Sequence, residues 1–267
     1  MAFSFVQISD HHLRVSKSSL LRGFSTNYAY QEVLRHIAVH AAAEVDFIVA
    51  TGDLVESGSE AEYGLMSSLL GIQEKPAVPG PHRIQLDGPV KHFPMYIWPG
   101  NHDDRSHFYS ALYSNGVEGA LFNAAFVHKG VQFVYLDWGA QDRAIAHRQT
   151  LEFLERTLKT ELPVILLTHH QVAPVESAWL DRYIAEGIDE FWEIVAGKHI
   201  LGIFCGHVHL TFETQKRCIP IYTVGSTGFQ FVRQDQPLVC LTPPQYRVVT
   251  VDGERITTRV VDVILER

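Results

Sequence analysis

The stretch FPMYIWPGNHDD, residues 93–104, places a small polar cluster directly behind an apolar run. The run Phe93–Trp98 is aromatic and aliphatic without interruption, which is typical of a central strand that is covered on both faces. Gly100 then allows a sharp turn, and Asn101, His102 and two aspartates follow. These side chains can bind metal ions or transfer protons, so the stretch is either an ordinary turn or one corner of a catalytic site.

The same pattern recurs behind four other apolar runs. Asp10 and His12 follow Phe3–Ser9, Asp53 follows Asp46–Ala50, His169 follows Pro163–Thr168, and His207 and His209 follow His199–Cys205. Strands of an α/β sheet bind ligands at their carboxyl ends, so we expect these side chains to converge. In an extended chain, residues two apart point the same way, so each of the two pairs should serve one spot. One such strand end would indicate a turn, but five in one chain predict a metal site.

The remaining pattern predicts an α/β sheet followed by antiparallel hairpins. Further runs of strand length are Val131–Leu136, Ile219–Val224, Tyr246–Val251 and Ile256–Ile264. Helical spacing occurs at Tyr30–Ala43, Glu60–Leu70, Arg105–Tyr113 and Thr150–Thr160. Residues 73–92 are rich in proline and glycine, and we expect an irregular loop at the amino ends of the strands, away from the site. Without a repeat or a clear linker, residues 1–267 are expected to form a single domain.

Composition narrows the function. The 267 residues carry a formal charge of -8 and a pI near 6.0, so no general attraction to nucleic acid or anionic membranes is expected. No apolar stretch is long enough to span a bilayer, and the N-terminus has no basic leader. The three cysteines, Cys205, Cys218 and Cys240, lack metal-type spacing. These features predict a cytoplasmic protein with reduced thiols, whose substrate is not a nucleic acid polymer.

The chemistry of the strand-end residues indicates the kind of ion. The set holds two aspartates, one asparagine and four histidines, without a thiolate. Imidazole combined with carboxylate suits Zn, Fe, Mn or Co better than Ca or Mg. Seven ligands are too many for one transition-metal ion, but they suit two divalent ions that share a bridging carboxylate.

In this order, the motifs D-x-H, G-D, G-N-H-D, H and G-H-x-H resemble those of the calcineurin-like metallophosphoesterase superfamily. The stretches THHQVAPVESAWLD and GSTGFQF are similar to the class III cyclic-nucleotide phosphodiesterase and glycerophosphodiesterase branch. Gln171 and Val172 replace the usual Pro-Pro of that branch, and His11 stands where Thr, Pro or Ser is common. None of these three residues stands at a metal-ligand position of the family. The differences from the family pattern therefore concern the choice of substrate and leave the predicted metal site unchanged.

The resemblance implies a four-layer α/β/β/α sandwich with a dinuclear metal site at the carboxyl ends of the strands. It assigns Asp10, His12 and His209 to the first ion, Asn101, His169 and His207 to the second, and Asp53 to both. A hydroxide between the ions is the expected nucleophile, and His102 is the expected catalytic acid. Asp103 and Asp104 could either orient His102 or cap a helix.

Three functions follow from this site. The first is hydrolysis of small phosphodiesters, such as cyclic nucleotides or glycerophosphodiesters. The same two ions would also serve a phosphomonoesterase or a pyrophosphohydrolase, and the walls of the pocket separate these activities. A non-catalytic binding module with this fold would be expected to lack some ligands or His102, and here all eight residues are present. Association into a homo-oligomer stays open.

Overall fold

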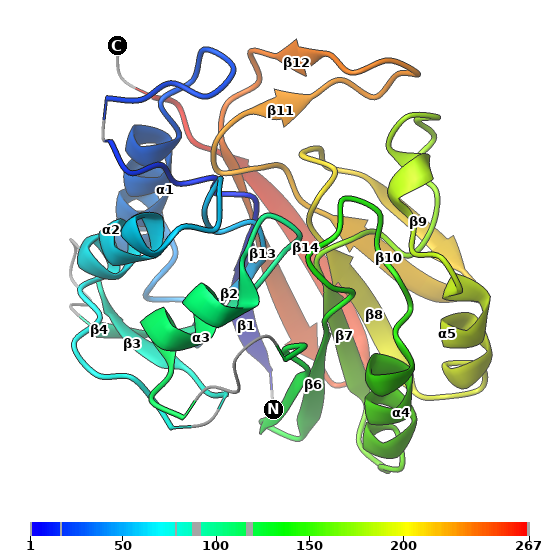
Figure 1. Ribbon diagram of the computed structural model, residues 1–267. Helices are drawn as coiled ribbons and strands as arrows, with labels where there is room; N and C mark the ends of the chain where they lie inside the picture. The colour runs from blue at the N-terminus through cyan, green and yellow to red at the C-terminus, as the bar shows by residue number, and fades with distance from the viewer. Residues whose placement is uncertain (1, 17, 78, 87–91, 116–119, 266–267) are drawn as a thin grey trace.

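The computed structural model describes residues 2–16, 18–77, 79–86, 92–115 and 120–265. Two six-stranded sheets pack face to face, with α1, α2 and α3 outside one sheet and α4 and α5 outside the other (Figure 1). The predicted four-layer α/β/β/α sandwich is therefore confirmed. No helix among the described residues is long and apolar enough to cross a bilayer.

Each sheet has a parallel centre and antiparallel margins. The first has the order β14-β13-β1-β2-β4-β3, formed by Arg255–Asp262, Gln245–Asp252, Phe3–Ile8, Phe47–Thr51, His92–Trp98 and His82–Gln85. The second has the order β5-β6-β7-β8-β10-β9, formed by Ala124–His128, Val131–Leu136, Val164–Thr168, Ile200–Cys205, Ile219–Thr223 and Glu213–Lys216. A short pair, β11 (Gln230–Phe231) and β12 (Val239–Cys240), extends beyond the sandwich (Figure 1).

The helices bury apolar faces against the sheets. They are α1 (Thr26–His40), α2 (Glu60–Leu70), α3 (Arg105–Leu112), α4 (Arg148–Thr157) and α5 (Ile188–Ile194), with a 3₁₀ turn, η1, at Asp181–Tyr183. Between the sheets, the ring of Phe5 lies 5.4 Å from that of Phe133 and 5.6 Å from that of Phe204. Successive side chains of strand β7 point to opposite faces of its sheet. Ile165 and Leu167 belong to the core between the two sheets, whereas Val164 and Leu166 belong to the core under α4 and α5.

The apolar runs predict the central strands to within one or two residues, and a tight turn at Gly253 and Glu254 joins β13 to β14. The expectation of a wholly irregular loop over residues 73–92 is wrong. Strand β3 pairs antiparallel with β4 there and brings Ile84 and Leu86 into the core. Residues 78 and 87–91 of this segment lie outside the described part of the chain.

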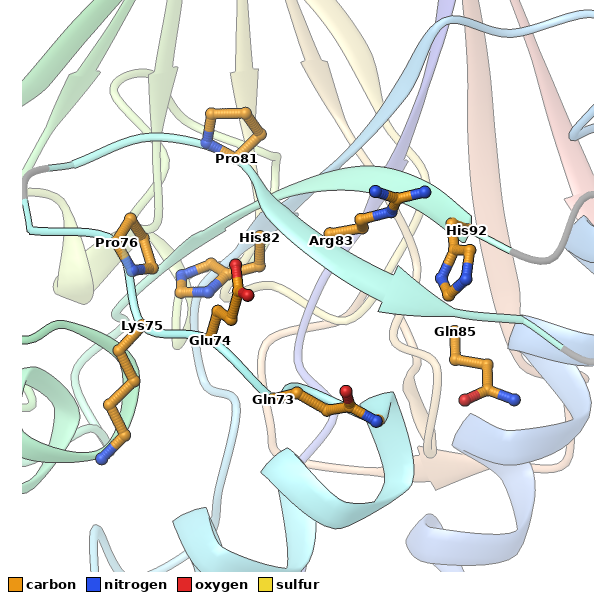
Figure 2. A pocket seen from close by; sticks show the side chains of 10 residues that line it. Gln73, Glu74, Lys75, Pro76, Pro81, His82, Arg83, Gln85 and His92 are labelled. Atoms are coloured by element: carbon orange, nitrogen blue, oxygen red, sulfur yellow. The ribbon is translucent and has the colours of Figure 1, made fainter.

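The segment before β3 lies against the far end of α3. Lys75 donates to the carbonyl oxygen of Ser110 over 2.7 Å. Between the segment and the start of β4 is a hollow of about 420 Å³, which Figure 2 shows from close by. Its lining residues run from Gly71 to His92 and include none of the strand-end residues that the sequence singles out. No described residue of this segment lines the cleft at those strand-end residues, so for the described residues the expected separation from the site holds.

Candidate metal centre

The five polar strand ends meet at one edge of the sandwich because the strands that carry them run in parallel. Strands β1, β2 and β4 are parallel neighbours in the first sheet, and β7 and β8 in the second. Backbone hydrogen bonds then join the loops, from Asp10 N to Gly52 O over 2.9 Å and from Gly206 N to His169 O over 2.9 Å. Between the two sheets' loops, Thr227 N donates to Ser9 O over 3.1 Å.

The backbone at these ends is not extended, so the reason given for pairing Asp10 with His12 and His207 with His209 is wrong. Strand β1 ends at Ile8, and the four residues have φ values of 57°, 45°, 67° and 46°. These left-handed conformations bend each loop so that its side chains turn into one centre. Non-glycine residues in this region are uncommon and gather at functional sites.

Two glycines allow the loops to touch. Gly52 has a φ of 99°, and a Cβ there would lie 2.5 Å from Nδ1 of His169. A Cβ at Gly100 would lie 2.3 Å from the backbone nitrogen of Asp53 and 2.8 Å from Cε1 of His169. The glycines of TGD and GNH are thus required because the loops of β2, β4 and β7 pack in direct contact.

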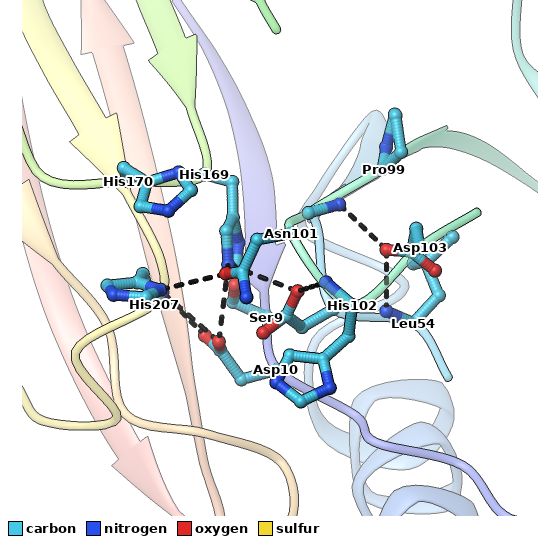
Figure 3. Close-up of polar contacts among 12 residues, drawn as sticks. Ser9, Asp10, Leu54, Pro99, Asn101, His102, Asp103, His169, His170 and His207 are labelled. Atoms are coloured by element: carbon cyan, nitrogen blue, oxygen red, sulfur yellow. Dashed lines mark hydrogen bonds and ion pairs between the residues drawn. The ribbon is translucent and has the colours of Figure 1, made fainter. Parts of the chain in front are cut away.

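The structure brings all seven predicted ligands together, in two groups. In the first group, Nε2 of His209 lies 3.3 Å from Oδ1 of Asp10 and 3.1 Å from Nε2 of His12. In the second group, Oδ1 of Asn101 lies 3.1 Å from Nε2 of His169 and 3.1 Å from Nδ1 of His207. Figure 3 shows Asn101, His169 and His207 turned toward this common point.

Asp53 lies between the two groups. Its Oδ2 is 3.5 Å from Nε2 of His12, and its Oδ1 is 3.2 Å from Nε2 of His169. One carboxylate oxygen therefore faces each group, which is the arrangement that a bridging ligand needs. Of the seven side chains, only that of His207 is not buried.

The outer nitrogens of three histidines are held by hydrogen-bond acceptors. Nδ1 of His12 donates to Oε2 of Glu56 over 2.7 Å, Nδ1 of His169 donates to Thr51 O over 2.8 Å, and Nδ1 of His209 donates to Phe229 O over 2.8 Å. This outer contact fixes the ring and the tautomer, and it directs the Nε2 lone pair inward.

These hydrogen bonds test whether the residues fit a metal. With their Nδ1 protons used outward, His12 and His209 turn two Nε2 lone pairs toward each other over 3.1 Å. Nε2 of His169 likewise faces the oxygens of Asp53 and Asn101, where either a proton or a metal ion can be shared among them. Facing lone pairs repel unless a cation lies among them, so the donor set fits divalent transition-metal ions.

The electrostatics of the centre are those of a cation site. Burial raises the pKa of Asp53, but His169, His102 and His12 outweigh it and hold the pKa well below its usual range. Burial lowers the pKa of His169, but Asp53 and Asp10 outweigh it and raise the pKa to about 9. The carboxylates are thus charged at neutral pH, and the field they create at the centre favours positive charge.

His102 lies beside the centre without joining either group. Its Nδ1 donates to Glu56 O over 2.7 Å, and its backbone nitrogen donates to Oδ1 of Asp53 over 2.9 Å. Burial lowers the pKa of His102, but Asp53 and Glu56 outweigh it and raise the pKa. The side chain is 36% exposed and lines the cleft. His102 can therefore donate a proton or a hydrogen bond to a molecule bound there.

The two aspartates after His102 have structural roles. Asp104 caps α3 by accepting a hydrogen bond from His107 N over 2.9 Å, so the capping alternative is the one observed. Asp103 accepts hydrogen bonds from Leu54 N over 3.1 Å, Gly100 N over 2.7 Å and the hydroxyl of Tyr63 over 2.7 Å. Asp103 thus ties the loop after β2 to the loop after β4 (Figure 3).

Two histidines next to the ligands, His11 and His170, stay outside the groups. Nδ1 of His11 lies 2.8 Å from Oγ1 of Thr227. The ring of His170 packs against that of His207 at 4.3 Å and an angle of 34°, and its Nε2 lies 3.3 Å from Asp142 O. Both pack around the centre rather than face it.

The centre opens into a cleft of about 260 Å³. Glu56, Arg22, Trp179, Tyr183, Phe229 and Phe231 line it together with the ligands. Sequence reasoning assigned no role to any of the six. Glu56 had a local signal, because it follows Asp53 by three residues, and Trp179, Phe229 and Phe231 lie in the stretches THHQVAPVESAWLD and GSTGFQF. Arg22 and Tyr183 lie outside these motifs, and only the fold brings them to the cleft.

The sandwich and its edge of histidines and aspartates define the class of protein, a hydrolase of the metallophosphoesterase type. The model of the calcineurin-like phosphoesterase family matches residues 3–210. The chain belongs to this family, whose members act on phosphoesters with divalent metal ions.

Relatives of known name agree with this assignment. The chain is 31% identical over 233 residues to the 3',5'-cyclic adenosine monophosphate phosphodiesterase CpdA of Escherichia coli (strain K12), which covers 85% of this chain and 76% of the relative. It is 29% identical over 273 residues to CpdA of Vibrio vulnificus (strain CMCP6), covering 97% and 89%. A dimetal phosphatase from Danio rerio shares the fold with a TM-score of 0.60 at 13% identity, covering 98% and 99%.

Proposed function

We propose that this protein, as a single domain of residues 1–267, is a metal-dependent phosphodiesterase that hydrolyses small phosphodiesters, with 3',5'-cyclic nucleotides as the preferred class. Two divalent transition-metal ions (Mn, Fe, Zn or Co) would be held by the two groups of ligands. Asp10, His12 and His209 would hold the first ion. Asn101, His169 and His207 would hold the second, and Asp53 would bind both.

One observation carries the proposal. The inward nitrogens and oxygens of seven side chains converge while the outer nitrogens of His12, His169 and His209 already donate to other groups. The Nε2 atoms of His12 and His209, whose Nδ1 protons are used outward, face each other over 3.1 Å, and a cation between them would stabilise this arrangement. One carboxylate oxygen of Asp53 faces each group of ligands, which supports two ions rather than one.

When bound, the ions would supply a hydroxide near neutral pH and would offset the negative charge of the phosphate. The residues of the chain set the rest of the reaction. His102 lies on the cleft side of the centre, where it can donate to the leaving oxygen of the diester. Its ring is oriented by Glu56 O, which leaves Nε2 free for this task. Because Asn101 is neutral and Asp53 is shared, the second ion should be bound more weakly.

The substrate class rests on the relatives and on the cleft. The relatives from Escherichia coli and Vibrio vulnificus act on cyclic adenosine monophosphate by name. The cleft of about 260 Å³ lies slightly below the usual range of small-molecule pockets, roughly 300–1,000 Å³, so it suits a small diester. A diester carries one negative charge, which two ions and His102 would neutralise.

The test is a substrate panel combined with metal analysis. The protein would be loaded in turn with Mn, Zn, Fe and Co and assayed on 3',5'-cyclic nucleotides, glycerophosphoethanolamine and p-nitrophenyl phosphate. We expect diesters to be hydrolysed with a higher kcat/KM than the monoester. No diesterase activity with any metal would contradict the proposal, and a preference for the monoester would favour a phosphomonoesterase.

The assignment of Asp53 has its own test. Asp53→Ala should lose both ions and the diesterase activity, because one carboxylate serves both groups. Asp46→Ala is the matched control, since Asp46 is an aspartate paired with Lys129 and His128 away from the cleft. Two ions still bound to Asp53→Ala would show that Asp53 does not bridge.

A further inference from the structure

An arc of aromatic rings runs from one group of ligands to the other around the cleft. The ring of Phe231 lies 4.8 Å from His209 and 4.9 Å from Trp179. Trp179 lies 6.2 Å from Tyr183, whose ring is 5.3 Å from His207. A metal centre does not need such rings for its own chemistry, so they form a wall for the part of the substrate that is not phosphate.

Arg22 lies at one end of this wall. Its guanidinium carbon is 5.6 Å from the ring centre of Phe229 and 5.6 Å from that of Phe231. The guanidinium and the two rings thus combine a positive charge with flat apolar surface, which is an arrangement that attracts aromatic groups.

The backbone holds Arg22 in place. Leu21 N donates to Phe24 O over 2.8 Å, and Phe24 N donates to Leu21 O over 2.9 Å. Between them, Arg22 and Gly23 have φ values of 51° and 88°, so both central residues of this tight turn are left-handed. The side chain of Arg22 is exposed, and within the described part of the chain no carboxylate forms an ion pair with it. Its charge is therefore left for a ligand.

The position of Arg22 shows which part of a ligand it would meet. The ring of Phe229 lies 4.6 Å from that of His209 and 5.8 Å from that of His12, and its centre lies 5.6 Å from the guanidinium carbon of Arg22. Phe229 thus contacts both the first group of ligands and Arg22, and all of them line one cleft. In a 3',5'-cyclic nucleotide the ribose connects the phosphate to the base, so a phosphate at the ligands places the base within the same cleft.

We propose that Arg22, Phe229 and Phe231 form a stacking subsite for the nucleobase of the substrate. The proposal rests on the proposed function and names the residues that would distinguish cyclic nucleotides from other diesters. A base would stack on the flat face of the guanidinium and rings while its phosphate lies at the metal centre. Arg22 thereby acts as a specificity residue and takes no part in the chemical step.

Arg22→Lys is the decisive variant because it keeps the charge and removes the plane. The ratio of kcat/KM for 3',5'-cyclic adenosine monophosphate to that for glycerophosphoethanolamine, which has no base, should fall about fivefold or more. The dissociation constant of adenosine, measured by calorimetry, should rise by a similar factor. Both expectations follow from a stacking contribution of about 1–3 kcal/mol per base.

Arg156→Lys is the matched control. Its guanidinium carbon lies 5.7 Å from the ring centre of Phe153 on α4, outside the cleft, so the ratio and the adenosine affinity should stay at the wild-type values. Because Arg22 is exposed, its replacement should not disturb the core, and urea unfolding would verify this.

Two results would overturn the subsite. In the first, Arg22→Lys and Arg22→Ala both keep the wild-type ratio and adenosine affinity. In the second, Arg22→Ala lowers kcat/KM for both diesters equally and Arg22→Lys restores it, which would make Arg22 a guide for charge alone. Failure of the proposed function is a separate result. A wild-type protein that does not hydrolyse cyclic nucleotides would refute that function, whereas the adenosine measurement needs no turnover and still decides the subsite.

Discussion

Arg105 and Asp137 offer the most quantitative test of how the GNHDD loop is held. Nε of Arg105 donates to Oδ2 of Asp137 over 2.8 Å, and Nη2 donates to Oδ1 over 2.5 Å. Nη1 donates to Gly100 O over 2.7 Å and to Asp103 O over 2.5 Å. The pair is 5% and 1% exposed. Arg105 therefore closes the turn that presents Asn101.

Replacing Arg105 with Met leaves the Asp137 carboxylate buried without its counter-ion. Removal of one partner from a buried pair costs about 3–5 kcal/mol, because the other charge stays uncompensated. Two carbonyl groups of the loop also lose their donor. Since stabilities of whole proteins are about 5–15 kcal/mol, Arg105→Met should remove about a fifth or more of the free energy of unfolding.

A second replacement separates stability from positioning. In Arg105→Met/Asp137→Asn the buried charge is gone, so the loss of stability should shrink to about 1–3 kcal/mol. Activity should stay low in both variants, because the carbonyl oxygens of Gly100 and Asp103 lack their donor in each. Arg148→Met is the control, since Arg148 pairs with Glu152 on the surface and should cost under about 1 kcal/mol.

The assay is urea unfolding of the metal-free protein, with kcat measured separately after metal loading, because bound metal adds its own stability. Burial raises the pKa of Asp137, but Arg105 outweighs it and lowers the pKa. The pair therefore stabilises the protein above the unfolded pKa of about 3.9, and this is lost as the pH falls below it. The difference in free energy of unfolding between the wild type and Arg105→Met should therefore become smaller as the pH is lowered. A deficit under 1 kcal/mol at pH 7, or a double variant no more stable than the single one, would refute the reasoning.

Three further predictions concern other residues. His102→Ala should keep both metals and lose about 10²–10⁴-fold in kcat, whereas His107→Ala, on the adjacent helix, should change little; full activity on a diester with a poor leaving group would exclude an acid role. Asn101→Asp should tighten the weaker of two metal affinities by adding charge, and equal affinities in the wild type would refute the asymmetry. Burial lowers the pKa of His82 to about 4, so wild-type stability should decline as the pH falls from about 6.5 toward 4. His82→Leu should flatten that decline in urea unfolding, and an unchanged slope would show that His82 is not its cause.

The central strands could be predicted because burial on both faces leaves a continuous apolar run. The elements that were missed lack this signal. Strand β3 carries alternating polar residues and lies at an edge of its sheet, so its sequence resembles a loop. Helix α5 is only seven residues long, and its fold is set by Phe191 and Trp192 packing under the second sheet. Such elements depend on tertiary contacts that the local sequence does not contain.

The candidate ligands could be predicted from residue type and from position after a strand, but the geometry that gathers them could not. The pairs Asp10/His12 and His207/His209 reach the centre through left-handed backbone rather than through an extended strand. The acceptors behind the ligands are still less visible in the sequence, since two of them are backbone carbonyls of Thr51 and Phe229. Any residue type can supply a carbonyl, so no residue pattern marks it.

The left-handed backbone conformations at the centre depend on the hydrogen bonds that hold the surrounding loops together. Each non-glycine residue in the left-handed region costs on the order of 1–3 kcal/mol and persists only where its surroundings determine it. Here the surroundings are the contacts that join the loops, such as Asp103 between Leu54 and Gly100, and Arg105 on the carbonyls of the same turn. None of these groups faces the cleft, so they stabilise the loops without occupying space that metal or substrate would use. The second aspartate of GNHDD caps a helix and the first joins two loops, which is why a cluster that looks like five site residues contains only two that face the cleft, Asn101 and His102.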